Sequence, residues 1–280
     1  MSKTHELIQK LQDGIRDLFN SGRYADYLQF LSAFHNYSAG NCLLIWSQMP
    51  EATLVASYSD WNNKHHRQVK KGAKGIKILC PHTYRENDEK GEQRERISFH
   101  CGTCFDVSQT YAICGEDIPQ LCRSLDYDVV GFRALLRIFM QQISPVPVQF
   151  ENIPGNTRGY FSPTECRISI KEGMSEADTL KTLIHEIAHA MLHAKGAEEE
   201  KTDRRTKEVE AESIAYVVSQ HLNIDTSDYS FGYVAGWSSD KSVPELRISI
   251  EVIRKTSDII IGLIEEATTN EQYEWAPEIA

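Results

Sequence analysis

Apolar residues recur at helical spacing at both ends of the chain. They return every three or four positions from Leu7 to Leu18, which predicts an opening helix. A second helical run follows the Ser21-Gly22 break, and a short third one stops before Pro50. Residues 243–267 show the same period near the other end. Each of these segments is expected to bury one face.

Strand-forming segments lie between the helical ones. Residues 76–80 follow a glycine-bearing turn, and residues 97–110 follow a polar loop. Residues 145–150 should be extended, because proline disfavours helix there. Residues 159–170 form a hairpin pattern, with Arg167–Lys171 as its second strand. This mixture of helices and strands predicts an α+β fold.

Charge is distributed unevenly along the 280 residues. Residues 1–125 carry 15 Lys and Arg against 14 Asp and Glu, whereas residues 126–280 carry 15 against 26. A near-neutral half and a strongly acidic half suggest units with different partners. The length allows two domains, and the polar segment 115–122 is a suitable boundary. We therefore expect domains over residues 1–125 and 126–280.

The composition points to a soluble protein in a reducing compartment. No apolar run approaches the roughly 18 residues that span a membrane, and the first residues lack the apolar core of a secretion signal. The seven cysteines are an odd number and scattered, which argues against a disulfide framework. A cytoplasmic location and no membrane partner are expected.

The sequence His-Glu-x-x-His marks a candidate metal centre in the second half. Apolar positions from Leu180 to Leu192 form a broad stripe after a Ser-x-x-acid start signal at Ser175, which predicts a buried helix. His185 and His189 lie one turn apart on one face, so both imidazoles can reach one ion. Glu186 is offset from them and can act as general base toward a metal-bound water.

A catalytic zinc site usually takes three protein ligands and a water, so the motif needs one more. His193 is unsuitable, because it lies about 12 Å along the helix axis from His185. A second helix, around residues 208–218, offers three glutamates. Glu208 and Glu212 share one face, so we expect Glu208 to bind Zn²⁺ and Glu212 to hydrogen-bond a ligand imidazole. An exposed helix charge is the alternative for Glu208.

The stretch from Trp61 to Arg85 is basic and contains no acidic residue. Cationic side chains around a turn, with aromatic residues nearby, suit single-stranded DNA, because lysines can meet phosphates while bases stack on rings. The alternative is a solvated basic surface with the tryptophan in the core. The candidate DNA contacts are Trp61, Arg67, Lys70, Lys71, Lys74 and Lys77.

Both halves resemble known families. The pair of elements His185-Glu-Ile-Ala-His189 and Glu208-x-x-Ala-Glu212 is similar to the gluzincin arrangement of ImmA/IrrE-type metallopeptidases. In those proteins the first Glu of the second element is the third zinc ligand, which implies that role for Glu208. The first half resembles the N-terminal domain of ArdC-type antirestriction proteins, a family that joins a single-stranded-DNA-binding domain to a zincin-like domain, often on mobile elements. The matching segments are Tyr37-Ser-Ala-Gly-Asn41, Val69-Lys-Lys-Gly-Ala-Lys-Gly75 after Trp61, and Phe105-Asp-Val-Ser-Gln-Thr110.

Taken together, the residues and the resemblance predict a mixed α/β DNA-binding domain followed by a zincin-like, gluzincin-type metallopeptidase domain. The Zn²⁺ site would cleave an unidentified protein, whose strand we expect along an edge formed by Arg167–Lys171. A different class also fits: an antirestriction protein that coats single-stranded DNA and holds its metal for structure alone. A third possibility is a regulator whose protease removes a repressor while the first domain senses DNA.

Overall fold

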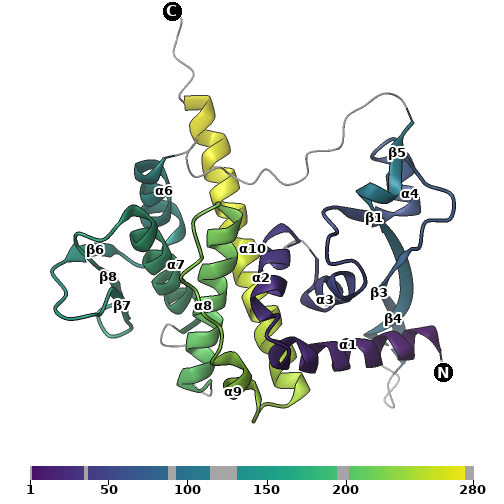
Figure 1. Cartoon of the computed structure of the whole chain (residues 1–280), viewed down its shortest axis with the longest axis horizontal. Coiled ribbons are helices and arrows are strands. Elements are labelled where there is room, and N and C mark those ends of the chain that lie inside the picture. The colour runs from purple at the N-terminus through teal and green to yellow at the C-terminus, as the bar shows by residue number, and fades with distance from the viewer. Residues whose placement is uncertain (1, 35–36, 88–92, 114–130, 194–201, 275–280) are drawn as a thin grey trace, which may run out of the picture. The chain divides into compact units, whose positions relative to one another are not determined.

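The chain folds into two compact units. A computed structural model describes residues 2–34, 37–87, 93–113, 131–193 and 202–274 (Figure 1). Unit 1 comprises Met1–Ser21 and Tyr37–Cys122, and unit 2 comprises Gly22–Asn36 and Arg123–Ala280. Both units combine helices with strands, which confirms the predicted two-domain α+β class.

Unit 1 is built around a three-stranded antiparallel sheet with strand order β1-β4-β3. The central strand β4 pairs with the whole of β3, in a long hairpin that runs from Ile76 opposite Cys104 to Asn87 opposite Gln93. Helices α1 and α3 pack on this sheet. The elements are α1 (Lys3–Asn20), α3 (Ala39–Gln48), β1 (Val55–Ser57), α4 (Tyr58–Asn63), β2 (Arg67–Val69), β3 (Ile76–Asn87), β4 (Gln93–Asp106), the 3-10 turn η1 (Val107–Gln109) and β5 (Thr110–Ala112).

A smaller pair of strands, β2 and β5, completes unit 1 and frames its basic turn. The two strands run antiparallel, with Gln68 opposite Tyr111. Under them, Trp61 packs with Val69 and Val107 in an apolar cluster. The lysine-rich residues 70–75 connect β2 to β3, so the cluster anchors one end of this turn.

Unit 2 is a helical layer beside a small sheet. Helix α8 packs against α7, α10 and α2, and its central apolar residues are buried. The Tyr24 hydroxyl of α2 lies 2.8 Å from the Ser213 hydroxyl of α8. Helix α2 therefore joins unit 2 although unit 1 surrounds it in sequence, and a single cut near residue 125 does not describe this arrangement. Residue 125 itself lies outside the described residues.

The sheet of unit 2 has the strand order β6-β8-β7. Strand β8 pairs with β6 in parallel and with β7 antiparallel, so Arg167–Lys171 is the central strand. The expectation that it forms an edge is wrong: Ile168 and Ile170 are fully buried between neighbours. In this sheet β7 is an edge strand, and it packs against α7.

The remaining elements of unit 2 follow the sequence pattern closely. The segment expected to be extended, residues 145–150, overlaps strand β6 at residues 148–150, and the predicted hairpin is present as β7 and β8. No helix in the described ranges is long and apolar enough to cross a bilayer. The elements are α2 (Tyr24–Ala33), α6 (Phe132–Ile138), the π-helical turn η2 (Phe139–Ile143), β6 (Val148–Glu151), β7 (Gly159–Ser162), β8 (Arg167–Lys171), α7 (Glu176–His193), α8 (Arg204–His221), α9 (Val234–Ser238) and α10 (Val243–Glu274).

Candidate metal centre and nucleic-acid surface

Helix α7 holds the His-Glu-x-x-His motif in a fixed rotation. At its start, the Ser175 hydroxyl accepts a hydrogen bond from the Asp178 backbone N–H at 3.1 Å, a typical helix cap. The apolar stripe of α7 is fully buried, at Leu180, Leu183, Ile184, Ile187 and Ala188. Because this stripe cannot turn outward without large loss of apolar burial, the motif side chains are held in one place.

The two motif imidazoles face each other through their Nε2 atoms. The Nε2 of His185 lies 3.0 Å from the Nε2 of His189, and the rings stand edge to face at 79°. Both nitrogens thus point at one small volume, as in a pair that binds a common ion. The separation of four residues produces this arrangement, since a helix turns once in 3.6 residues.

Helix α8 adds a carboxylate to the same volume. The Oε2 of Glu208 lies 3.7 Å from the Nε2 of His185 and 3.6 Å from that of His189. Ligand atoms of the three side chains lie within 4.8 Å of one another. No second group of three such side chains comes together in the described part of the chain. Two imidazoles and one carboxylate are a donor set typical of catalytic zinc.

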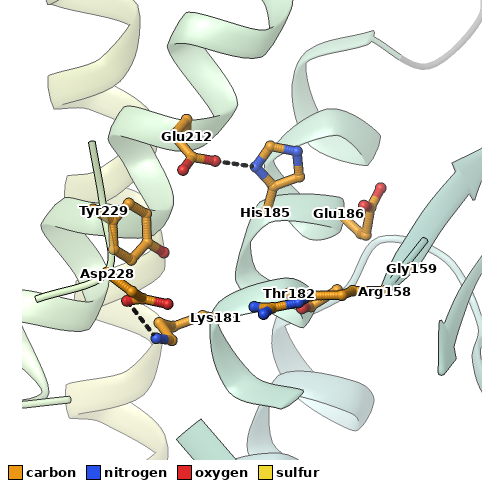
Figure 2. Close-up of a pocket in the computed structure, with 9 residues that line it drawn as sticks. All are labelled: Arg158, Gly159, Lys181, Thr182, His185, Glu186, Glu212, Asp228 and Tyr229. Atoms are coloured by element: carbon orange, nitrogen blue, oxygen red, sulfur yellow. Dashed lines mark hydrogen bonds and ion pairs between the residues drawn. The ribbon is translucent and has the colours of Figure 1, made fainter. Parts of the chain in front are cut away.

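Glu212, one turn after Glu208, reaches the other nitrogen of His185. Its Oε2 lies 3.3 Å from the Nδ1 of His185 (Figure 2). Burial disfavours a charged imidazole here, but contacts with the carboxylates of Glu208 and Glu212 outweigh it and raise the pKa of His185 to about 10. Contacts with His185 and His189 hold the pKa of Glu208 well below its usual range. The pocket therefore favours a positive charge between the imidazoles and the carboxylates.

Glu186 is buried beside this group, with 7% of its surface exposed. Burial raises the pKa of its carboxyl, although the nearby imidazoles and a hydrogen bond from the Phe161 backbone N–H oppose this. A carboxylate with a raised pKa accepts protons more readily near neutral pH. Its position and environment suit a general base.

Two cavities meet at His185 and Glu186. One, here termed the Lys181 cavity, has a volume of about 470 Å³ and extends past Lys181 to Tyr229 (Figure 2). The other, the Phe161 cavity, has a volume of about 530 Å³ and extends past Phe161 to the first turn of α8. Gly159 lines both. Glu186 thus lies where the two cavities join.

Gly159 lets strand β7 approach α7 closely. A Cβ at this position would lie 2.7 Å from the Thr182 Cγ2 and 3.0 Å from the Ser169 carbonyl oxygen. Contacts this short would force β7 away from the helix that carries the motif. The absence of a side chain therefore sets the distance between the edge strand and Glu186.

Two of the six predicted DNA contacts lie in the core of unit 1. Trp61 is fully buried, and its indole N–H donates to the Phe105 carbonyl at 2.8 Å. Arg67 is 8% exposed, and its Nε donates to the Thr110 hydroxyl at 2.7 Å. Neither offers a surface to a nucleic acid in this structure. The burial of Trp61 agrees with the alternative interpretation, in which the tryptophan is a core residue.

The four lysines of the prediction are exposed, and they lie on and next to the β2–β3 turn. Lys71 and Lys74 extend into solvent, Lys70 donates to the Ser108 carbonyl, and Lys77 donates to the Thr103 hydroxyl. Tyr58, 54% exposed, accepts a hydrogen bond from Gln68 on the adjoining strand. This surface keeps the cationic character expected for phosphate binding, with a tyrosine in place of the tryptophan.

Family comparisons match the two halves of the chain separately. The N-terminal domain of anti-restriction factor ArdC matches residues 3–105, and the IrrE N-terminal-like domain matches residues 143–255. The chain therefore carries an ArdC N-terminal-like domain followed by an IrrE N-terminal-like domain, which confirms the predicted resemblance to ArdC-type proteins. The candidate metal ligands lie in the IrrE-like part of the chain, and the exposed lysines lie in its ArdC-like part.

Crystal structures of the antirestriction protein ArdC from plasmid R388 share the fold of this chain. The metal-free structure has a TM-score of 0.55 and 20% identity, covering 84% of this chain and 86% of that one. The Mn(II)-bound structure has a TM-score of 0.58 and 20% identity, covering 94% and 98%. At this identity, the likeness establishes a common fold.

A relative by sequence is an uncharacterized protein of Bacillus anthracis. It is 27% identical over 319 aligned positions, which take in 97% of this chain and 53% of the relative. The chain therefore spans about half the length of the curated relative it matches.

Sequence patterns predicted the two helices of the candidate metal centre but not the strand and the other cavity-lining residues beside them. The structure brings His185, Glu186, His189, Glu208 and Glu212 together. Gly159, Phe161 and Tyr229 also line the site, and no motif marked them. Gly159, a glycine in the predicted hairpin, was the one sequence feature that could have pointed to this strand. Its role becomes clear only from the sheet order, which places β7 at the edge next to α7.

Proposed function

We propose that the chain is a Zn²⁺-dependent metallopeptidase whose first unit binds single-stranded DNA. The observation that carries the peptidase proposal is the convergence of His185, His189 and Glu208 next to a buried Glu186. Mn(II) in the related ArdC protein supports a divalent ion at these residues. Zn²⁺ is the specific choice, because two imidazoles and a carboxylate with room for water are its usual catalytic ligands.

The proposed reaction is hydrolysis of a peptide bond. When bound, Zn²⁺ would polarise the peptide carbonyl and lower the pKa of water at the site. Glu186 accepts a proton from the attacking water and later donates it to the leaving amine. Glu212 orients His185 through Nδ1, which leaves Nε2 directed at the ion.

Strand β7 is the proposed support for the substrate backbone. It pairs with β8 on one side only among the described strands, so an extended peptide can add along its other side. Gly159 lines both cavities together with His185 and Glu186. A peptide added to β7 would pass Glu186 and place neighbouring side chains in the two cavities.

A Glu186→Gln variant tests the peptidase proposal. The substitution removes the general base without removing a proposed ligand. Purified wild-type protein and variant should each carry one metal ion, while cleavage of a diverse peptide library should fall roughly 10²- to 10⁴-fold in the variant. His185→Ala and Glu208→Ala should lose the metal itself. A Glu186→Gln protein that cleaves as fast as wild type would rule the mechanism out.

A second function is supported by the exposed lysines of unit 1. In this alternative the chain is a non-proteolytic antirestriction protein that coats single-stranded DNA, and the metal stabilises the second unit. The same Glu186→Gln variant separates the two. It should retain both DNA binding and protection of incoming DNA if hydrolysis plays no part. A cytoplasmic protein encoded on a mobile element fits either proposal.

A further inference from the structure

The first turn of α8 has an unusual charge for a helix start. It carries Arg204, Arg205 and Lys207 and no acidic residue. The N-terminal end of a helix is positive, so cations there destabilise the helix, whereas acidic residues would stabilise it. This occurs in the more acidic half of the chain. The helix start alone identifies no ligand, but two of these cations line a cavity.

Arg204 and Lys207 line the Phe161 cavity together with residues of strand β7. Neither side chain forms an ion pair within the described ranges. The adjacent acid, Asp203, is engaged elsewhere, because its Oδ2 lies 2.6 Å from the Lys241 Nζ. The carboxylates that line the cavity are Glu186 and Glu208, both assigned to the metal centre. Among the described residues, the cavity therefore has two cations without an ion-pair partner.

The Lys181 cavity differs, because its cations are already paired. Lys181 Nζ lies 2.8 Å from Asp228 Oδ1, and Arg158 lies 3.0 Å from Asp178. Glu212 adds a further carboxylate to that wall. An acidic side chain entering the Lys181 cavity would compete with existing ion pairs. One entering the Phe161 cavity would meet two cations that form no ion pair with any described residue.

We propose that Arg204 and Lys207 make the Phe161 cavity a subsite for an Asp or Glu side chain next to the scissile bond. The inference deepens the proposed peptidase function and rests on it. Phe161, Tyr160 and Pro163 supply the apolar surface that covers the methylene groups of such a side chain. The guanidinium and ammonium groups then meet its carboxylate, and the acidic residue fixes which bond lies at Glu186.

Binding of peptide hydroxamates tests the subsite without requiring turnover. Two series would be used on the Zn²⁺-loaded full chain, with a Glu, Gln or Lys residue placed either before or after the hydroxamate. In the series whose variable residue enters the Phe161 cavity, calorimetry should give the Glu compound a Kd about tenfold lower than that of the Gln compound. This is the difference expected for two partly exposed ion pairs. The difference should weaken at high salt.

Charge variants test whether Arg204 and Lys207 cause the preference for the Glu compound. In the Arg204→Gln/Lys207→Gln protein, the Glu and Gln compounds should bind equally, and Lys207→Glu should turn the preference toward the Lys compound. Arg205→Gln is the matched control, because it removes the same charge from the same turn but does not line the cavity among its described residues. Its preference should equal that of wild type.

Other outcomes overturn the inference. These are equal binding of Glu and Gln compounds to wild type, an unchanged preference in the double variant, or no hydroxamate binding at all. Displacement of the Glu compound by a short oligothymidylate would assign the cations to nucleic-acid phosphates instead. Failure of the peptidase proposal has a separate signature: wild type would keep the Glu preference in binding yet hydrolyse no peptide in the library.

Discussion

The Oε2 of Glu212 lies 3.3 Å from the Nδ1 of His185, while the Nε2 of the same ring faces His189 and Glu208. One imidazole is thus held on both sides by residues from α8. A carboxylate on Nδ1 fixes the tautomer that leaves Nε2 available to an ion and increases the basicity of the ring. The helix pair therefore determines both where His185 lies and which nitrogen it offers.

Replacing Glu212 should weaken metal binding without destroying the site. We expect Glu212→Ala to lower the affinity for Zn²⁺ about 10- to 100-fold, because His185 loses the partner of its Nδ1. Competition with a chelator of known affinity measures this change. Glu266→Gln, an exposed charge on α10, is the control and should bind as wild type does. An unchanged affinity in Glu212→Ala would mean that packing alone orients the ring.

Adding one methyl group at Gly159 should impair hydrolysis while leaving the metal in place. The Cβ of Gly159→Ala would meet Thr182 at 2.7 Å and the Ser169 carbonyl at 3.0 Å, so β7 must move from α7. A shift of about 1 Å in substrate position can cost roughly 10²-fold in rate. Peptide cleavage should fall by this order, with metal content unchanged. Gly262→Ala, whose Cβ meets nothing within 4 Å, is the control and should cleave normally.

Reversing the lysine charges of the β2–β3 turn should weaken binding to single-stranded DNA. In the Lys70→Glu/Lys71→Glu/Lys74→Glu variant, the slope of log K against log salt should become shallower by about two, since each phosphate contact contributes roughly 0.7. Binding to an oligothymidylate at several salt concentrations measures the slope. Reversal of the exposed Lys10, Arg247 and Lys255 changes net charge equally and should leave it unaltered. Equal slopes in both variants would remove the turn from the DNA-binding surface.

The sequence predicted the helices of the candidate metal centre well, because their signals are local. The spacing of His185 and His189 and the apolar stripe of α7 depend only on helix geometry. Glu208 and Glu212 could be paired with them because both lie one turn apart on a second amphipathic helix. Distances between α7 and α8 were not needed to choose these residues, although the distances support the choice.

Features that depend on distant segments could not be predicted in the same way. Strand β8 looked like an edge, because nothing in the hairpin reveals that β6 pairs with its other side. Trp61 lies in a basic stretch, yet packing against Val69 and Val107 buries it. The apolar residues of helix α2 would have the same helical spacing whichever core the helix joined. Its place beside α8 in unit 2 could therefore not be predicted from the sequence. Periodicity identifies a buried face but not the partner that covers it.

Asp203 should stabilise the second unit in a pH-dependent manner, because it caps the helix that carries Glu208. Its Oδ1 accepts from the Thr206 backbone N–H at 3.0 Å, and its Oδ2 lies 2.6 Å from Lys241 Nζ. The hydrogen bond from Lys241, followed by that from Thr206, lowers the pKa of Asp203 from its ordinary value of 3.8. A lowered pKa in the folded state means that the stabilisation is complete above about pH 4 and is lost as the pH falls further.

We therefore expect Asp203→Ala to cost about 1 kcal/mol at pH 7, as for a lost helix cap, and to lower the Tm of metal-free protein by roughly 2–4 °C. The difference from wild type should shrink steadily below pH 4, because wild-type Asp203 becomes protonated and loses its charged contacts. Thermal unfolding followed by circular dichroism between pH 3 and pH 7 measures this. Asp26→Asn is the control: its pairing with Arg23 at 3.9 Å is exposed on both sides and should contribute almost nothing at any pH. A Tm difference for Asp203→Ala that stays constant from pH 7 to pH 3 would show that the carboxylate charge does not stabilise the start of α8.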